Sequence, residues 1–300
     1  MNFGPANMNA TAEYLNDNIT DYFDDYQNDH IILPVMFIAC CVGLPLNGIV
    51  IWLLTFQIKR NPFTISILNL AIADFGYLIS MFMYCIDFFI AFITPGIPNL
   101  IMFSFCQIMY INGLFLLTAI SIDRCVAVFF PIWHRCSRPK YLSSAICVFL
   151  WIFSFLLTGI LNATEYILEF FTISNPHLVV NAVLCFPLIT TFTVILFIKI
   201  GLKRKQIKRR RLLMMISITL LCFFILIVPL HIYAFFLDFT EIIYSMQLWR
   251  VKNYFNLCSC LNSDFNPVIY FLVGRKKHAQ SRESMKVIFQ RVFTEDDSNV

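Results

Sequence analysis

Residues 31–58 read IILPVMFIACCVGLPLNGIVIWLLTFQI and contain no charged side chain. A helix needs about 20 consecutive apolar residues to cross the hydrocarbon core of a bilayer. The stretch is longer than that, and it ends where Lys59 and Arg60 begin. It therefore predicts a membrane-spanning helix.

Further apolar stretches of this kind follow along the chain. They are Pro62–Thr94, interrupted only by Asp74 and Asp87, Phe88–Ile122, Tyr141–Thr164, Pro176–Ile198, Leu212–Leu237, and Tyr254–Val273, interrupted by Asp264. Hydrophobic residues make up 59% of the 300-residue chain and charged residues 13%, against about 45–50% and about 25% in soluble proteins. The sequence predicts an all-α membrane protein, a seven-transmembrane helix bundle. It excludes a disordered chain, a disulfide-stapled mini-protein, a soluble enzyme and a nucleic-acid-binding domain.

The charges between the predicted spans indicate how the chain crosses the membrane. Residues 1–30 carry acidic but no basic side chains, whereas Lys and Arg follow the first, third, fifth and last spans. Short loops rich in Lys and Arg stay on the cytoplasmic side. We therefore expect a multi-pass protein of the plasma membrane with an extracellular N-terminus and a cytoplasmic C-terminus.

The two ends of the chain carry further predicted features. The expected parts are an extracellular acidic segment (1–30), the seven-transmembrane domain (31–273) and a cytoplasmic amphipathic helix with a tail (274–300). The outer segment has glycosylation sequons at Asn9 and Asn18. Apolar residues on one side of the tail predict a short eighth helix on the bilayer surface. The C-terminus, Ser298-Asn299-Val300, matches a ligand for PDZ domains.

Polar side chains lie inside the predicted spans, where an ionisable group is costly and often functional. Asp74 lies in the second span, Asn47 in the first, and Asn262 and Ser263 precede Pro267 in the last. One interpretation is a network of interhelical hydrogen bonds that stabilises the bundle. The other is a hydrated, cation-binding centre that switches conformation, and the two are compatible. The 11 cysteines show no metal-ligand spacing, so neither a metal nor a cofactor is expected.

A series of short motifs occurs in order at matching depths of the spans. It comprises Gly43–Asn47, Leu70–Asp74, Asp123-Arg124-Cys125, Trp151, Pro187, Pro229 and Asn266-Pro267-Val268-Ile269-Tyr270. This series resembles the rhodopsin-like (class A) G-protein-coupled receptors. Within that class the chain is similar to the Mas-related receptors, most strongly in Arg60–Thr64, Leu116–Cys125, Pro131–Tyr141 and Tyr270–Gly274. The resemblance implies a receptor that binds an extracellular ligand and activates heterotrimeric G proteins.

The resemblance and the position of the outer polar groups suggest three sets of site residues. G-protein coupling and the activation switch are implied for Asp123, Arg124, Ile132, Pro229, Asn266, Pro267 and Tyr270. A polar core or sodium site is implied for Asn47, Asp74, Asn262 and Ser263. The candidate ligand pocket comprises Asp87, Cys106, Tyr110, Glu165, His231 and Asp238.

The chain also departs from the class A pattern. Ile227 stands two residues before Pro229, where most members have a tryptophan switch. The inner end of the sixth span is basic, Lys208–Arg211, so the acid that commonly pairs with Arg124 is absent and only Asp123 remains as its local partner. Cys106 occupies the position where amine-binding receptors place an aspartate. We therefore expect a weakly held inactive state, and no salt bridge to a small amine at Cys106.

The acidic outer segment favours a cationic peptide or another basic ligand, by charge complementarity. Family analogy favours coupling to phospholipase C with calcium release, and inhibitory coupling is the alternative. Other interpretations are a receptor fold that serves as an accessory partner without its own ligand, and a seven-span transporter. The chain shows no internal repeat of the transporter kind. It also lacks the motifs of an intramembrane enzyme, so we do not expect an enzyme.

Overall fold

The computed structural model describes residues 30–90, 97–130, 132, 136, 138–139, 141–168, 186–202, 210–239, 245–274 and 287. The predicted glycosylation sites at Asn9 and Asn18, almost all of the acidic segment, and the eighth helix and C-terminal motif lie outside these residues. The division into three parts and the eighth helix therefore stay predictions.

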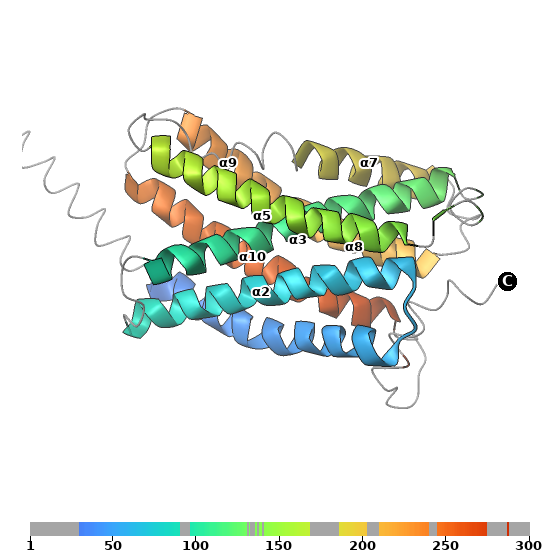
Figure 1. Cartoon of the computed structure of the whole chain (residues 1–300), viewed down its shortest axis with the longest axis horizontal. Helices are drawn as coiled ribbons and strands as arrows, with labels where there is room; N and C mark the ends of the chain where they lie inside the picture. Colours follow the sequence, from blue (N-terminus) through green and yellow to red (C-terminus); the bar gives the residue numbers. More distant parts are fainter. Residues whose placement is uncertain are drawn as a thin grey trace, which may run out of the picture.

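Every described element is a helix, and the helices lie along the long axis of an elongated bundle (Figure 1). The first is His30–Gln57, whose last turn is the π-helix η1 (Leu53–Gln57). The others are α2 (Pro62–Ile90), α3 (Ile97–Phe129), α5 (Leu142–Leu168), α7 (Phe186–Leu202), α8 (Arg210–Leu226), α9 (Val228–Phe239) and α10 (Ser245–Gly274). With α8 and α9 counted as one interrupted span, these elements correspond to the seven predicted spans.

Apolar composition continues onto the outside of the bundle. Among the described residues, five helices are long and apolar enough to cross a membrane, and the apolar segment of α7, Phe186–Ile195, is shorter. On α5, for example, Val148, Ile152 and Phe155 are more than half exposed and recur at helical spacing. Water would make such a face unfavourable, whereas lipid accommodates it.

Two helices extend past the boundaries expected from charge. α3 continues to Phe129, beyond Asp123 and Arg124, and α10 begins at Ser245 rather than at Tyr254. An isolated charged residue does not stop a helix, because the backbone hydrogen bonds are unaffected and a long basic side chain can reach toward water. The longer α10 places Lys252 on a helix and not in a loop.

The start of α2 is set by a reciprocal cap. The Asn61 carboxamide oxygen accepts a hydrogen bond from the Thr64 backbone N–H (2.7 Å), and the Thr64 hydroxyl oxygen accepts one from the Asn61 backbone N–H (2.8 Å). Such pairs satisfy N–H groups that have no partner within the helix. Pro62 occupies the first helical position, where its missing N–H costs nothing.

The sixth span is interrupted next to its proline. α8 ends at Leu226 and α9 begins at Val228, so the break falls at Ile227, two residues before Pro229. Proline has no N–H to donate to the carbonyl four residues back, and its ring crowds that carbonyl. The break divides the span into α8 and α9, which are its inner and outer parts under the topology predicted from the charges; inner and outer are used in that sense below.

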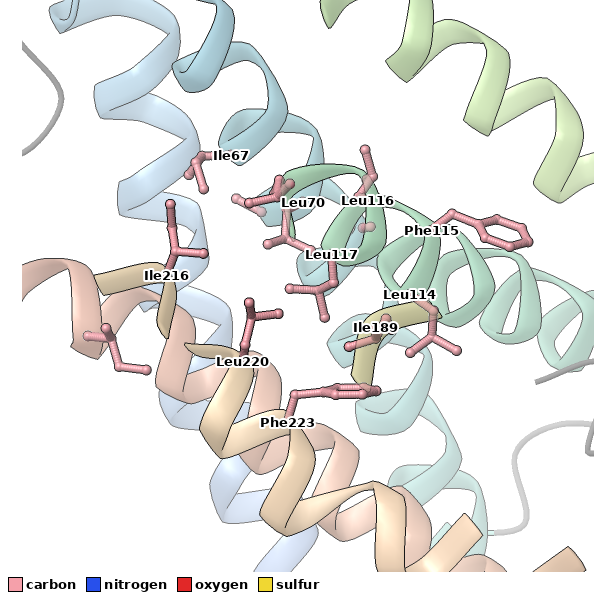
Figure 2. Close-up of a cluster of buried hydrophobic side chains, with 14 of the residues drawn as sticks. Ile67, Leu70, Leu114, Phe115, Leu116, Leu117, Ile189, Ile216, Leu220 and Phe223 are labelled. Atoms are coloured by element: carbon pink, nitrogen blue, oxygen red, sulfur yellow. The ribbon is translucent and has the colours of Figure 1, made fainter. Parts of the chain in front are cut away.

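The inner half of the bundle is closed by apolar side chains from four helices. Figure 2 shows Ile67 and Leu70 of α2 and Leu114 and Leu117 of α3 lying near side chains of α7 and α8, whereas the Phe115 ring of α3 points away from them. The contributions of α7 and α8 are Ile189, Ile216, Leu220 and Phe223. α3 contacts α2, α5, α7 and α8. It is therefore the helix against which the rest of the bundle is positioned.

Helix His30–Gln57 approaches α2 and α10 most closely at Gly43. A β-carbon at this position would overlap the Asp264 carboxylate of α10 and lie 2.9 Å from the Leu78 side chain of α2. A residue with a β-carbon fits here only if the Asp264 carboxylate and the Leu78 side chain move. Gly43 therefore determines how closely the first helix packs against the other two.

Gly43→Ala should lower the stability of the folded protein, by about 1–3 kcal/mol, because the added methyl group overpacks a three-helix contact. The matched control is Gly159→Ala on α5, where a β-carbon would meet nothing within 4 Å. We expect the control to be neutral or slightly stabilising. Thermal unfolding in detergent measures both changes, and equal Tm values for the two variants would contradict the packing argument.

Candidate functional site

The inner end of α3 holds a cluster of charged groups, called here the inner cluster: Asp123, Arg124, Arg138 and Ser143. Arg124 is only 1% exposed, and its guanidinium donates to one oxygen of Asp123 at 2.6 Å. Arg138 contacts the other Asp123 oxygen at 2.8 Å and donates to the Ser143 hydroxyl of α5 at 2.6 Å. The carboxylate of Asp123 thus bridges two arginines and connects α3 to the start of α5.

The Arg124 guanidinium has a further partner on α2. It lies 4.4 Å from the centre of the Phe63 ring, a cation–π contact. The charged side chain of Arg124 is thus buried at the inner end of the bundle, in contact with the Asp123 carboxylate and the Phe63 ring. Ile132, the expected apolar contact of the second inner loop, is 79% exposed, as an intermolecular contact would require.

Arg138 was missing from the sequence-based site. The expectation was that Asp123 alone would pair with Arg124, whereas Asp123 also binds Arg138. The residue had been grouped with the basic loop charges that indicate membrane topology. Nothing in its local sequence distinguishes it, because the contact depends on where Arg138 lies relative to the ends of α3 and α5.

Deeper in the bundle, Asp74 is the centre of a polar cluster formed mainly with α10. Its two carboxylate oxygens accept hydrogen bonds from the Ser263 hydroxyl (3.0 Å) and from the Asn266 carboxamide (2.7 Å). All three side chains are buried. These bonds join α2 to α10, as the stabilising interpretation of the sequence expects.

Pro267 explains how the first helix joins this polar cluster. A proline within α10 cannot donate to the carbonyl four residues back, that of Ser263. The Asn47 carboxamide donates to that carbonyl at 3.2 Å and to the Gly43 carbonyl at 3.1 Å. Asn47 therefore satisfies the oxygen that Pro267 leaves without its helical partner, and it ties the first helix to α10.

A small cavity adjoins the polar cluster. It offers about 20 Å³ to water and is lined by side chains of α2, α3, α8 and α10, including Asp74, Asn262 and Ser263. One water needs about 10–15 Å³ measured in this way. The buried Asn262 carboxamide oxygen accepts no hydrogen bond from the described residues. The cavity can therefore hold about one water molecule beside the Asp74 carboxylate, which fits the hydrated centre of the second interpretation but leaves no room for a cation with its own water shell.

Above the cavity lies a group of rings, called here the aromatic cluster: Tyr110, Phe186, His231 and Phe255. The Tyr110 hydroxyl and His231 Nε2 are hydrogen-bonded at 3.0 Å. Phe186 of α7 and Phe255 of α10 pack against the imidazole, with ring centres 4.3 Å and 4.4 Å away. The cluster joins α3, α7, α9 and α10 at one level of the bundle.

The aromatic cluster lies about one helical turn beyond Ile227, the position at which most class A receptors have a tryptophan. His231 is two residues beyond Pro229 and only 2% exposed, so its imidazole moves with α9. Sequence reasoning named Tyr110 and His231 separately but did not pair them, and it did not include Phe186 or Phe255. Only the packing of four helices brings these rings together.

The remaining ligand-pocket candidates lie toward the outer end. Asp87 is partly exposed near the end of α2, and Cys106 is partly buried on α3, one turn before Tyr110. α5 continues to Leu168, so Glu165 belongs to the helix. Asp238 belongs to α9. The side chains of Glu165 and Asp238 lie outside the described part of the structure.

Comparison with known proteins identifies the family. Residues 46–270 match the family described as "7 transmembrane receptor (rhodopsin family)". The chain is 35% identical to Mas-related G-protein coupled receptor member B2 of Mus musculus, over 89% of this chain and 81% of that protein. It is 32% identical to Proto-oncogene Mas of Mus musculus, over 97% and 93%. It is 34% identical to Mas-related G-protein coupled receptor member X1 of Rattus norvegicus, over 86% and 82%. The chain belongs to the rhodopsin family of seven-transmembrane receptors, a family of receptors rather than enzymes, and within it to the Mas-related G-protein-coupled receptors.

Proposed function

We propose that this receptor binds a basic extracellular ligand, such as a cationic peptide, and activates heterotrimeric G proteins by displacement of the inner part of the sixth span, α8. The observation that carries the proposal is the inner cluster, because it buries an arginine at the end of α3 that the predicted topology assigns to the cytoplasm. Its acidic partner in the described part of the chain is a single carboxylate. A G protein would contact Arg124, Tyr270 and Ile132 once α8 has moved. The N-terminus would be extracellular and the C-terminus cytoplasmic, in the plasma membrane.

The ligand signal would reach α8 through the aromatic cluster. Pro229 separates α8 from α9, and His231 of α9 is bonded to Tyr110 of α3. A ligand that binds better when this contact is broken would shift the population toward the active conformation. The cavity beside Asp74 would then change shape, because Phe223 and Ile227 of the same span line it.

Charge at the outer end supports a basic ligand. The outer segment 1–30 is acidic, Asp87 is partly exposed near the end of α2, and the extension of α5 places Glu165 on that helix. These negative charges would attract a cationic ligand to the outer end of the bundle and orient it there. For the inner side, we propose coupling through phospholipase C, with inhibitory coupling as the alternative.

Asp123→Asn should raise ligand-independent signalling by up to about ten-fold, the factor equivalent to about 1.4 kcal/mol, because neither ion pair of the inner cluster can form with a neutral amide. Calcium release and inhibition of cyclic AMP synthesis, measured in parallel in transfected cells, would also identify the coupling class. Ser143→Ala is the control, since it removes one neighbouring hydroxyl and keeps both ion pairs. Unchanged basal signalling at matched surface expression would contradict the role of Asp123.

Tyr110→Phe should also raise basal signalling, by roughly two- to ten-fold, because it deletes a hydrogen bond of about 0.5–1.5 kcal/mol and leaves the ring in place. Tyr254→Phe makes the same chemical change at an exposed position of α10 and should have no effect. If both variants behaved like the wild type, the aromatic cluster would not be the connection between α3 and α9 that controls α8.

Asp87→Asn should weaken activation by basic peptides, by about ten-fold in the concentration that gives half of the maximal response, because a charge-assisted contact contributes about 1.5–3 kcal/mol. The measurement is G-protein activation by a panel of basic peptides in cells expressing the wild type, Asp87→Asn or Arg124→Ala. Arg124→Ala should abolish the response to every peptide. A correctly localised wild type that responds to no peptide and has no basal activity would favour the accessory-partner function.

A further inference from the structure

Two buried thiols face each other between the first helix and α10. The Sγ atoms of Cys40 and Cys260 lie 3.9 Å apart, and both residues are 0% exposed. Both are free thiols, and either can donate to the other. The two sulfurs are thus already in contact, and a covalent bond between them would bring them about 2 Å closer.

Contacts further along the same two helices show how closely they pack beside the thiols. One turn beyond Cys40, a β-carbon at Gly43 would overlap the Asp264 carboxylate of α10. One turn further, the Asn47 carboxamide donates to the Ser263 carbonyl. Positions 40, 43 and 47 are spaced by three and four residues, so they lie on one face of the first helix. The close approach of the two helices along this face favours the short distance between Cα atoms, up to about 7 Å, that a disulfide requires.

A third thiol in the same buried cluster, Cys85 of α2, faces a different part of the first helix. Its Sγ donates to the Leu33 carbonyl oxygen at 3.7 Å. Leu33 precedes Cys40 by seven residues, which is about 10 Å along a helix axis. Cys85 is therefore held about two turns away from Cys40, and Cys260 is the thiol that opposes Cys40.

A space for a small molecule adjoins the cluster that contains these thiols. Tyr77 and Met109 belong to the same buried cluster as Cys40 and Cys260, and they also line the cavity beside Asp74, which has room for about one water molecule. Hydrogen peroxide is uncharged and little larger than water, so it crosses bilayers. It is therefore the class of oxidant that we expect to reach the pair, slowly, because buried thiols react less readily than exposed ones.

We infer that Cys40 and Cys260 are a site of reversible oxidation, at which hydrogen peroxide converts the two thiols into a disulfide. One sulfur attacks a peroxide oxygen, the O–O bond breaks, and a sulfenic acid and one water form. The second sulfur then attacks the sulfenic sulfur, so the S–S bond forms, the S–O bond breaks and a second water leaves. Two electrons pass from the sulfurs to the peroxide, and the two thiol protons end in the two waters.

The position of the pair determines what the disulfide would do. Because the second sulfur is already in contact, the sulfenic acid closes to the disulfide before it can be oxidised further. The bond would fix the first helix to α10 one turn before Ser263, whose hydroxyl donates to Asp74. Oxidation would thus restrain α10 beside the polar cluster. This inference does not depend on the proposed function.

The experiment treats the purified full-length receptor in detergent with hydrogen peroxide and then with dithiothreitol. Mass spectrometry of the digested wild type should show the peptides of Cys40 and Cys260 joined, with the loss of two hydrogens, and the reducing agent should separate them. The Tm should rise by roughly 3–10 °C on oxidation and return on reduction, because the bond closes a long loop. Cys40→Ser and Cys260→Ser should each lose both the link and the rise in Tm.

Cys41→Ser is the matched control, because Cys41 is the next residue on the first helix and is exposed. It should keep both the link and the rise in Tm. Three outcomes would each overturn the inference. They are a link from Cys260 to Cys41 or Cys85 instead of Cys40, no link at peroxide concentrations that oxidise the exposed Cys136, and a rise in Tm that survives in Cys40→Ser. The link is detected directly in the wild type, so the result stands even if a serine variant fails to fold.

Discussion

A carboxylate buried at membrane depth has to be satisfied by its neighbours, and the satisfaction of Asp74 organises the centre of this bundle. Ser263 and Asn266 supply the hydrogen bonds, so α2 and α10 can pack in only one register there. Pro267 leaves the Ser263 carbonyl without a helical partner, and Asn47 of the first helix supplies one. Three helices are thus joined by polar groups that lipid could not satisfy.

The features assigned to switching lie above and below this centre, and each is held by few contacts. At the inner end, one carboxylate bridges Arg124 and Arg138. At the level of the proline break, a hydrogen bond to Tyr110 and ring contacts with Tyr110, Phe186 and Phe255 hold His231. A ligand can shift the balance between two conformations only by the difference in its affinity for them. Contacts worth a few kcal/mol are therefore weak enough for ligand binding to overcome. The apolar side chains of α2, α3 and α7 in the core provide the rigid part against which α8 would move.

The outer end shows how charge and packing act together. α5 and α10 are both longer than their uncharged stretches, so Glu165 and Lys252 belong to helices. A charged group on a helix is held at a definite height in the bundle, which a loop does not ensure. Which charged groups have fixed positions at the outer end of the bundle therefore depends partly on where the helices end. The polarity of the sequence alone does not determine those ends.

The sequence by itself determined the class of the fold, the order of the spans and most of the residues at the centre. Long uncharged stretches have few alternatives to membrane helices, and motifs such as Asn266-Pro267 are local patterns that one chain displays. Asp74 stood out because an acid inside an apolar stretch is expensive. Only the tertiary structure decided which partners these residues have. Four contacts illustrate this, and each joins residues that are far apart in the chain or on separate elements. They are the hydrogen bond between Tyr110 and His231, the ion pair of Arg138 with Asp123, the close approach at Gly43 and the contact of Lys252 with Phe103. Such pairs depend on helix rotation and depth, which the packing of the whole bundle sets and no local pattern encodes.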